Sequence, residues 1–177
     1  EGEIDYCSVY ARTLCMPVTS ITVCVPREVF NLNGGFPEGI TFGEDFLLWA
    51  TISLQHKVVL LNKPLATYNQ DVPSDNRGTH HLTPPSHNFM WHLGQLADAP
   101  AMHPLLNRLL SYNLQPYYLS RRYHADSMAL LSTIDMSQAY PKSLRTYRRP
   151  LWLARLDYRM RRWLSSLKNA ICNLLPY

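Results

Sequence analysis

The sequence contains few of the patterns that build metal centres, disulfide frameworks or membrane spans. Its four cysteines form no Cys-x-x-Cys pair and stand at no metal-site interval from histidine. We therefore expect no zinc site, and we expect free thiols in a reducing, cytoplasmic compartment. No run approaches the roughly 18 consecutive apolar residues of a membrane-spanning helix. The chain begins at Glu1 without a basic-then-apolar leader, so we expect no secretory signal.

What the sequence does contain is typical of a globular protein. Its 177 residues suffice for one domain with a core or for part of a larger one, and 46% of them are hydrophobic and 17% charged. The net charge of +4 hides an asymmetry, because residues 1–100 carry five Lys and Arg against ten Asp and Glu, whereas residues 101–177 carry twelve against three. Such an asymmetry indicates different partners for the two halves.

The beginning of the chain predicts a helix followed by a strand. Asp5 is an N-cap candidate for a helix over residues 5–14, which should end before Pro17. Alternating apolar residues then predict a strand with one well-buried face over residues 19–25. Within that strand, Cys24 should behave as a small hydrophobe.

Two further helices are expected around a glycine-rich loop. Pro26 suits the first position of a short helix that ends through a left-handed residue at Asn33-Gly34. After the loop, a nearly all-round apolar pattern predicts a buried helix over residues 44–55. The side chains of the first helix expected to turn inward are Val29, Phe30 and Leu32.

The remaining chain predicts one or two short strands, a loop and a helical tail. The apolar run KVVLLN, residues 57–62, is typical of a strand covered on both faces, and residues 64–69 look like another extended segment. Residues 70–86 are rich in turn formers and predict a loop or boundary. Helices are expected at about residues 87–98, 102–120, 124–134 and 151–174.

These elements describe an α/β chain in which a few strands with covering helices precede a helical extension. The expected organisation is an α/β part over residues 1–70, a loop or boundary over 71–86, and a helical region over 87–177. A sheet with so few strands is marginal by itself, so we expect further strands upstream of this sequence.

Two adjacent carboxylates, Glu44 and Asp45, stand at the expected start of the buried helix, directly after Gly43. Acidic residues favour the first turn of a helix because they meet unpaired amide groups and the positive end of the dipole, so capping alone could explain the pair. Against capping alone, the preceding turns would aim both side chains at a cleft, and paired carboxylates mark functional sites.

Several motifs follow one another in a fixed order over about residues 5–70. They are TSITVCV, Gly34-Gly35-Phe36, Gly43-Glu44-Asp45, Leu48-Trp49, the strand at 58–61, and Pro64-Leu65 with Tyr68. This order resembles the acceptor-side half of the family 2 glycosyltransferases, which have the glycosyltransferase-A fold. The resemblance implies an enzyme that transfers a sugar, with inversion, from a nucleotide-diphosphate sugar to an acceptor hydroxyl, as in cell-surface polysaccharide or glycan synthesis.

The resemblance also implies roles for individual residues. Asp45 matches the usual catalytic base, and a carboxylate within reach of the acceptor hydroxyl suits that task. Glu44 would orient the acceptor or the loop, although the two roles could be exchanged. Trp49 would lie one helical turn from Asp45, and a core position is the alternative for it. The residues expected to contact the acceptor are Gly43, Trp49, Gly35 and Phe36.

The sequence departs from the family pattern in two ways. Leu47 and Thr51 occupy positions where family members commonly carry an acidic residue and an arginine, so a charge pair is absent. The donor half is also absent, since the sequence contains no Asp-x-Asp motif. We therefore expect the chain to be a fragment whose divalent metal, Mn²⁺ or Mg²⁺, and nucleotide sugar are bound by residues outside it.

The histidines give a weaker signal. His80, His81 and His87 follow the α/β part and could ligate a metal, because imidazole is a common ligand. Adjacent histidines on a polar loop are more often solvated, and we expect no metal site there. Those on expected helices, His92, His103 and His124, suit core or surface positions.

The expected last helix combines an apolar stripe with basic residues. The stripe recurs at three- and four-residue steps and comprises Leu153, Leu156, Met160, Trp163, Leu164, Leu167, Ile171 and Leu174. Such a helix can lie on an anionic membrane surface near a lipid-linked acceptor, on the inner face of the membrane, or it can pack on the domain with its basic face in water. Trp152 and Trp163 favour the membrane. The membrane-surface candidates are Arg155, Arg159, Arg161 and Arg162.

Two other classes of protein compete with the transferase. A nucleic-acid-binding module could use the same arginines on phosphates, but the front half is acidic and no recognition motif is present, so no nucleic-acid partner is expected. A non-catalytic helical interaction protein or a membrane-associated protein, derived from a transferase, would explain the absent donor motif and the uncharged Leu47 and Thr51.

Overall fold

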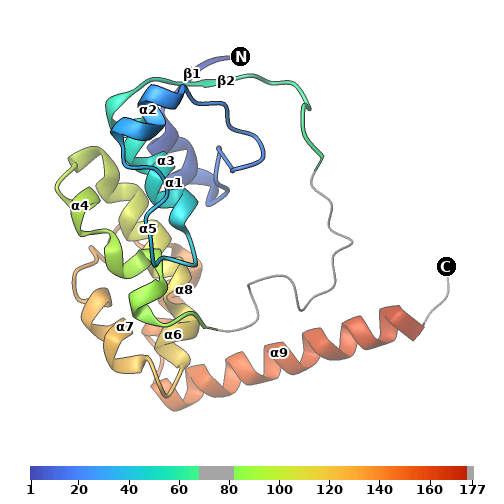
Figure 1. Ribbon diagram of the computed structural model, residues 1–177. Coiled ribbons are helices and arrows are strands. Elements are labelled where there is room, and N and C mark those ends of the chain that lie inside the picture. Colours follow the sequence, from blue (N-terminus) through green and yellow to red (C-terminus); the bar gives the residue numbers. More distant parts are fainter. Residues whose placement is uncertain (68–81, 175–177) are drawn as a thin grey trace. The chain divides into compact units, whose positions relative to one another are not determined.

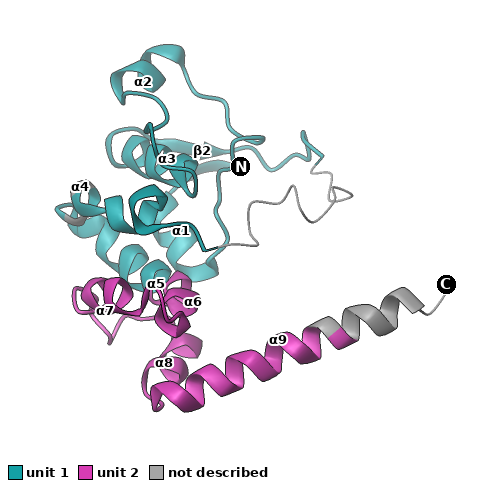
Figure 2. Ribbon diagram, turned by 60° about the horizontal axis from the view of Figure 1, so that its bottom comes forward, with its two compact units in different colours: residues 1–110 teal, residues 111–177 magenta. Residues whose placement is uncertain are grey.

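The computed structural model describes residues 1–67 and 82–174, which are mostly helical with one small sheet (Figure 1). Contacts divide the chain into two compact units, Glu1–Leu110 (unit 1) and Ser111–Tyr177 (unit 2), which Figure 2 colours separately. A mixed α/β composition is thus confirmed. Residues 87–110, which the sequence grouped with the C-terminal helices, belong to unit 1.

Unit 1 holds the only sheet of the described residues and most of the short helices. Its strands are β1 (Gly2–Ile4) and β2 (Val58–Leu60). Its helices are α1 (Tyr6–Thr13), α2 (Arg27–Leu32), α3 (Glu44–Gln55) and α4 (Gly94–Ala97), with the 3-10 turns η2 (Pro85–His87), η3 (Phe89–His92) and η4 (Pro100–Met102). Helix α5 (His103–Asn113) begins in unit 1 and ends in unit 2.

Helix α1 begins where its cap was expected. The Asp5 carboxylate accepts hydrogen bonds from the backbone N–H of Ser8 at 3.0 Å and from its hydroxyl at 2.7 Å. These bonds satisfy an otherwise unpaired helix donor, and they hold the pKa of Asp5 below its ordinary value. The helix ends at Leu14, which takes the left-handed conformation with φ 51°. A local capping signal therefore decided this helix.

Helix α3 is buried along most of its length, as its all-round apolar pattern predicted. Six of its residues are buried, namely Phe46, Leu47, Leu48, Trp49, Ala50 and Ile52. The rings of Tyr10 and Phe46 meet edge to face, with centroids 5.7 Å apart, so α1 and α3 share one core. The predicted bounds of α3, residues 44–55, are confirmed.

The strand predicted over residues 19–25 is wrong. Val23 and Val25 are half-buried and Cys24 is exposed, so burial alternates, yet these residues form no ladder with any other described segment. A strand needs a neighbour for its backbone groups. Local turn bonds are formed instead, because Thr22 N–H donates to Thr19 O at 2.9 Å. Cys24, expected to behave as a small hydrophobe within that strand, is an exposed free thiol.

The strand predicted within residues 57–62 is confirmed as β2, but the predicted burial of both its faces is wrong. β2 pairs antiparallel with β1, with Glu3 opposite Val59. A sheet of two strands leaves each strand an edge, and Val59 is 70% exposed, so β2 is not covered on both faces. The pairing with β1 brings together residues more than fifty positions apart, which periodicity cannot predict. Residues 64–67 form no regular element, and residues 68–81 lie outside the described part.

Helix α2 also differs in part from the prediction. Pro26 is its N-cap residue and not its first helical residue, and Leu32, expected to turn inward, is 82% exposed. A helix of six residues buries one narrow face, and Val29 and Phe30 are the half-buried residues of that face. The left-handed exit is confirmed, because Gly34 has φ 76°.

Unit 2 is a group of helices with one long terminal member. Its helices are α6 (Gln115–Leu119), α7 (His124–Leu131), α8 (Pro141–Tyr147) and α9 (Leu151–Leu174). The bounds of α9 are as predicted. The single helix predicted over 102–120 is broken into α5 and α6, because Pro116 in the first turn of α6 has no N–H to donate. Helix α8 was not predicted, and residues 87–98 form η3 and α4 in place of one helix.

Candidate functional site

The acidic pair lies in the first turn of α3, after a glycine in the left-handed conformation. Gly43 is the N-cap residue with φ 80° and ψ 21°, and its carbonyl accepts from Leu47 N–H at 3.2 Å. Glu44 and Asp45 therefore stand next to unpaired amide groups at the positive end of the helix dipole. The turn that the sequence predicted for this position is present.

Glycine is favoured at position 43 both by the positive φ and by the side chain of Phe89 packed against it. A Cβ at this position would overlap Cδ1 of Phe89 and lie 2.6 Å from its Cγ. Phe89 is held there because its N–H donates to Phe42 O at 3.0 Å, and its ring meets that of Phe46 with centroids 5.2 Å apart. Sequence reasoning missed Phe89, since nothing local links it to a glycine more than forty residues earlier. The one feature of the sequence that could have indicated Phe89 is that it is an aromatic residue just after the predicted loop.

The two carboxylates are half-buried and held differently. Asp45 Oδ1 accepts from Phe46 N–H at 2.8 Å, and Ser20 Oγ donates to Asp45 Oδ2 at 3.4 Å. Within residues 1–67 and 82–174, neither Glu44 nor Asp45 belongs to an ion pair. Asp45 is therefore in no salt bridge with these residues and remains partly accessible to solvent. Ser20 is a contact that sequence reasoning did not anticipate.

The expected acceptor residues other than Gly43 come together on α3. The rings of Phe36 and Trp49 meet edge to face at 5.7 Å, and Phe30 packs on Phe36 at 5.6 Å. Gly35 has φ 70°, and a Cβ there would come within 3.0 Å of the Phe30 ring. The Gly-Gly-Phe segment is therefore docked on the same helix that carries Asp45, four residues before Trp49.

Trp49 is a core residue, which was the alternative expected for it. It is 5% exposed, and its indole N–H has no hydrogen-bond partner among the described residues. It also lines a cavity of about 560 Å³ in unit 1, together with Tyr6, Ile52 and His56. Neither carboxylate lines this cavity. The cavity lies against the buried part of α3, and the acidic pair lies at the beginning of the helix.

The two departures from the family pattern are neighbours on α3. Leu47 is 2% exposed, and Thr51, one turn later, donates its hydroxyl to the Leu47 carbonyl at 2.8 Å. A charge at position 47 would be buried in the core, where its desolvation is costly. In this chain, these positions therefore supply packing and a backbone hydrogen bond, and neither supplies a charged contact.

Two tyrosines of α1 lie close enough to Asp45 to feel its charge. Burial, followed by the neighbouring charges that include Asp45, raises the pKa of Tyr6 well above its usual range. Burial, followed by the negative charge of Asp45, raises the pKa of Tyr10 to about 12. Both shifts favour the neutral phenol in the folded protein. Tyr6 and Tyr10 are thus neutral side chains near the carboxylate at ordinary pH.

We expect alkaline pH to destabilise unit 1 through these tyrosines. Because the pKa of Tyr10 is about 12 in the fold and about 10 when unfolded, the unfolded chain releases its proton first. The free energy of unfolding should therefore be unchanged by this group below about pH 10 and fall by about 2 kcal/mol as the pH approaches 12. Tyrosinate absorbance and circular dichroism against pH measure both effects.

The variant Tyr10→Phe should lose part of this alkaline dependence, because the buried phenol is removed. Tyr147 of unit 2 should also titrate late, since burial raises its pKa and its hydroxyl donates to Ser111 O at 2.6 Å. Titration of all eleven tyrosines in one step near pH 10, with the fold intact, would contradict the prediction.

The four arginines expected at a membrane surface have different environments. Arg155 is bound internally, because its Nε donates to Leu119 O at 3.0 Å and its Nη2 to Ser120 O at 3.3 Å. Arg161 is paired with Asp157 at 3.0 Å. Arg159 and Arg162 are exposed, and the Arg162 guanidinium lies 6.0 Å from the Tyr158 ring centroid. Two of the four candidates are therefore engaged within unit 2.

Beyond the first turns of α9, its apolar stripe is exposed as far as Leu167. Ala154 is buried, whereas Trp163 is 64% exposed and Met160 is 54% exposed. The beginning of α9 thus packs on other helices of unit 2, in agreement with the alternative stated for this helix. Among the residues described, no helix is both long enough and apolar enough to cross a bilayer. Exposed apolar residues of α9 are Trp152, Leu156, Met160, Trp163, Leu164 and Leu167.

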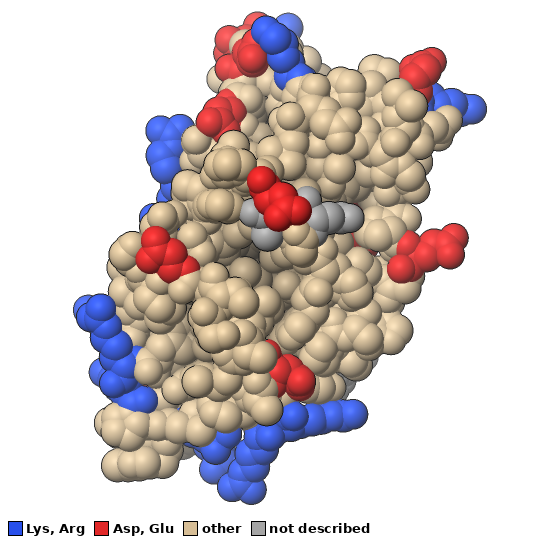
Figure 3. All heavy atoms as spheres, turned by 90° about the vertical axis from the view of Figure 1, so that its left-hand side faces the viewer, with Lys and Arg blue, Asp and Glu red and all other residues tan. Residues whose placement is uncertain are grey.

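The face drawn in Figure 3 is largely uncharged, with acidic and basic side chains scattered over it. Within unit 2, however, eleven Lys and Arg stand against three Asp and Glu. The basic character that the sequence placed after residue 100 is therefore concentrated in unit 2.

The described residues contain no group of three His, Cys, Asp or Glu that could hold a metal ion. His80 and His81, considered as ligands in the sequence, lie outside the described residues. A ring nitrogen of His92 lies 3.0 Å from Ser86 O, and one of His124 lies 2.6 Å from Tyr118 O. Both rings therefore form local hydrogen bonds with backbone carbonyl groups.

Comparison with known proteins adds no relative. No family model, no curated protein and no solved structure matches this chain.

Proposed function

We propose that this chain is the acceptor-side portion of an inverting glycosyltransferase of the family 2 type, with Asp45 as the catalytic base. The observation that carries the proposal is the start of α3, where the left-handed Gly43 presents Glu44 and Asp45 one turn from the packed pair Phe36 and Trp49. This arrangement joins the motifs on which the family resemblance depends. The glycosyltransferase-A fold is part of the same proposal.

The proposed chemistry is proton removal from an acceptor hydroxyl. As that oxygen attacks the anomeric carbon of the donor sugar, the bond to the nucleotide diphosphate breaks on the opposite face, and the hydroxyl proton passes to the Asp45 carboxylate. The carboxylate lies at the positive end of the α3 dipole. Glu44, in the same turn, would orient the acceptor. Ser20, within 3.4 Å of Asp45 Oδ2, would hold the base in position.

The donor and its metal are assigned to residues outside this chain. The sequence contains no Asp-x-Asp motif, and the described residues supply no ligand set for Mn²⁺ or Mg²⁺. No step proposed here passes through the metal.

The test is a transfer assay with the complete gene product that contains this chain. Nucleotide-diphosphate sugars are supplied with glycan and lipid-linked acceptors, and release of nucleoside diphosphate and the anomeric configuration of the product are measured. Transfer with inversion is expected. Transfer with retention, or no transfer from any donor, would contradict the proposal.

A membrane-associated role is the second candidate, favoured by the exposed stripe of α9. A helix with exposed tryptophans and leucines beside arginines can lie at an anionic lipid surface. In the transferase, this contact would hold the enzyme near a lipid-linked acceptor on the cytoplasmic face. In a non-catalytic descendant of a transferase, it would be the function itself.

We expect the variant Arg159→Gln with Arg162→Gln to bind anionic vesicles about thirtyfold more weakly than the parent. Each cation contributes about 1 kcal/mol at such a surface, and both side chains are exposed. Arg155 is left unchanged because it binds the carbonyls that follow α6. Co-sedimentation with anionic and neutral vesicles measures the effect, and added salt should weaken binding of the parent.

The control is Arg27→Gln with Lys63→Gln, which removes the same charge from exposed positions of unit 1. It should sediment with anionic vesicles like the parent. A parent that stays in the supernatant with both vesicle types would show that α9 is not a membrane anchor.

A further inference from the structure

Unit 2 contains a cavity whose wall is strongly basic. Its volume is about 510 Å³, within the range of small-molecule sites. Four of its lining residues are cationic and one is anionic, namely Lys142, Arg145, Arg149 and Arg161 against Asp157. This leaves three positive charges in excess around one concavity. None of these residues belongs to the proposed transfer site, which is in unit 1.

The cations converge because of helix geometry. Lys142 and Arg145 are three residues apart on α8, so their spacing places them on one side of that helix. Arg149 follows shortly after the helix ends and lines the same cavity. Arg161 reaches the cavity from α9. Two segments of unit 2 therefore supply charge to the same space, which local sequence spacing alone does not show.

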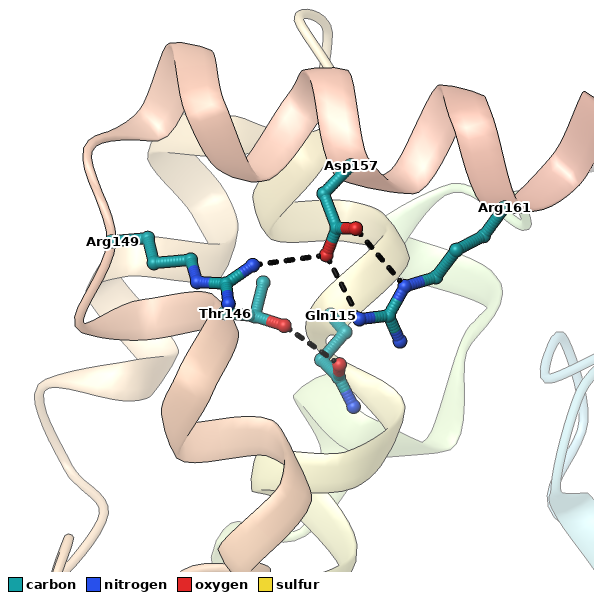
Figure 4. A network of polar contacts seen from close by, with 5 residues as sticks. All are labelled: Gln115, Thr146, Arg149, Asp157 and Arg161. Atoms are coloured by element: carbon teal, nitrogen blue, oxygen red, sulfur yellow. Dashed lines mark hydrogen bonds and ion pairs between the residues drawn. The ribbon is translucent and has the colours of Figure 1, made fainter.

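Asp157 bridges two of the guanidinium groups (Figure 4). Its Oδ2 accepts from Arg149 Nη1 at 3.1 Å, and its Oδ1 accepts from Arg161 Nε at 3.2 Å. Arg161 Nη2 also forms an ion pair with Oδ2 at 3.0 Å. The single negative charge of Asp157 balances only one of the two positive charges. The three side chains together therefore keep one positive charge.

The uncharged part of the wall is already hydrogen-bonded. Gln115 donates to Ser143 Oγ at 2.9 Å and accepts from Thr146 Oγ1 at 3.1 Å. Tyr112 and Tyr140 meet edge to face with centroids 5.3 Å apart and form an apolar side of the cavity. Recognition of a ligand thus falls to the cations, while the aromatic rings can contact an uncharged remainder.

We propose that this cavity binds a phosphate group carried by a larger molecule. A phosphate ester or diphosphate brings several oxygens and more than one negative charge, which suits converging arginines better than a single carboxylate does. A group with one negative charge would leave two of the three excess positive charges of the cavity without a counter-charge. The phosphate could belong to a soluble ester or to a lipid headgroup, and the chemistry of recognition is the same. The proposal does not depend on transferase activity.

The test compares two arginines that are close in sequence and differ in position. Arg145 lines the cavity, and Arg145→Gln leaves the Asp157 bridge intact. Arg148 is also exposed and does not line the cavity, so Arg148→Gln removes the same charge as a matched control. Circular dichroism confirms that both variants are folded.

Calorimetry with inorganic pyrophosphate is one arm, and co-sedimentation with phosphatidic acid vesicles is the other. Arg145→Gln should weaken binding about tenfold or more, because a hydrogen bond between charged groups is lost, and Arg148→Gln should bind like the parent. A selective effect with pyrophosphate identifies a soluble phosphate as sufficient, and one with vesicles alone identifies the lipid headgroup. Absence of selective loss in both arms, or equal weakening by both substitutions, would overturn the proposal.

Discussion

Replacing Asp45 by Asn is expected to lower the turnover of sugar transfer by a factor of about 10² to 10⁴, the loss typical of removing a general base. The amide has nearly the same shape as the carboxylate but cannot take the proton of the acceptor hydroxyl. Its oxygen can still accept from Phe46 N–H, so the start of α3 should be preserved. The assay is release of nucleoside diphosphate by the complete gene product.

Glu44→Gln is the matched control, since it removes the same charge one residue earlier in the same turn. If Glu44 orients the acceptor, the variant should lose much less turnover than Asp45→Asn. The reverse order of effects would show that the roles of the two carboxylates are exchanged. Equal activity of Asp45→Asn and the parent, with normal folding, would remove Asp45 as the base.

Gly43→Ala is expected to lower the free energy of unfolding by about 2 to 4 kcal/mol. The left-handed conformation costs an alanine about 1 kcal/mol, and the remainder comes from overpacking against the Phe89 ring. Phe89 cannot easily move away, because it is 5% exposed and packs on Phe46. Urea unfolding of parent and variant gives the difference.

Gly39→Ala separates the two contributions. Gly39 has the same φ of 80°, and a Cβ there meets nothing within 4 Å. This variant should therefore lose only the cost of the left-handed conformation, about 1 kcal/mol. If both variants lose the same stability, Phe89 does not restrict position 43, and the proposed reason for glycine before the acidic pair is wrong.

The start of the candidate site could be predicted from the sequence because its determinants are local. Gly43, the two carboxylates and the apolar run after them specify a helix start within one or two turns, and the predicted α3 is confirmed. Its partners could not be predicted in the same way. Phe89, Ser20 and Tyr10 reach Asp45 and Gly43 from distant parts of the chain.

The same division holds across the protein. By itself, the sequence determined the cap at Asp5, the left-handed exit at Gly34 and the extent of α9, since caps, positive φ and helical periodicity act within a few residues. Only the tertiary structure decided what needs a partner from elsewhere. Residues 19–25 alternate like a strand but pair with no other described segment, whereas β2 pairs with β1 from the beginning of unit 1.

In unit 2, periodicity predicted the basic residues of α9, and folding decided their use. Arg155 binds carbonyl groups that α6 leaves unpaired, and Arg161 joins Asp157 and Arg149 beside a cavity. Arg159 and Arg162 stay exposed. The reason is physical: a helix pattern determines which side a residue faces, but hydrogen bonds and ion pairs form only with the groups that tertiary packing brings within reach.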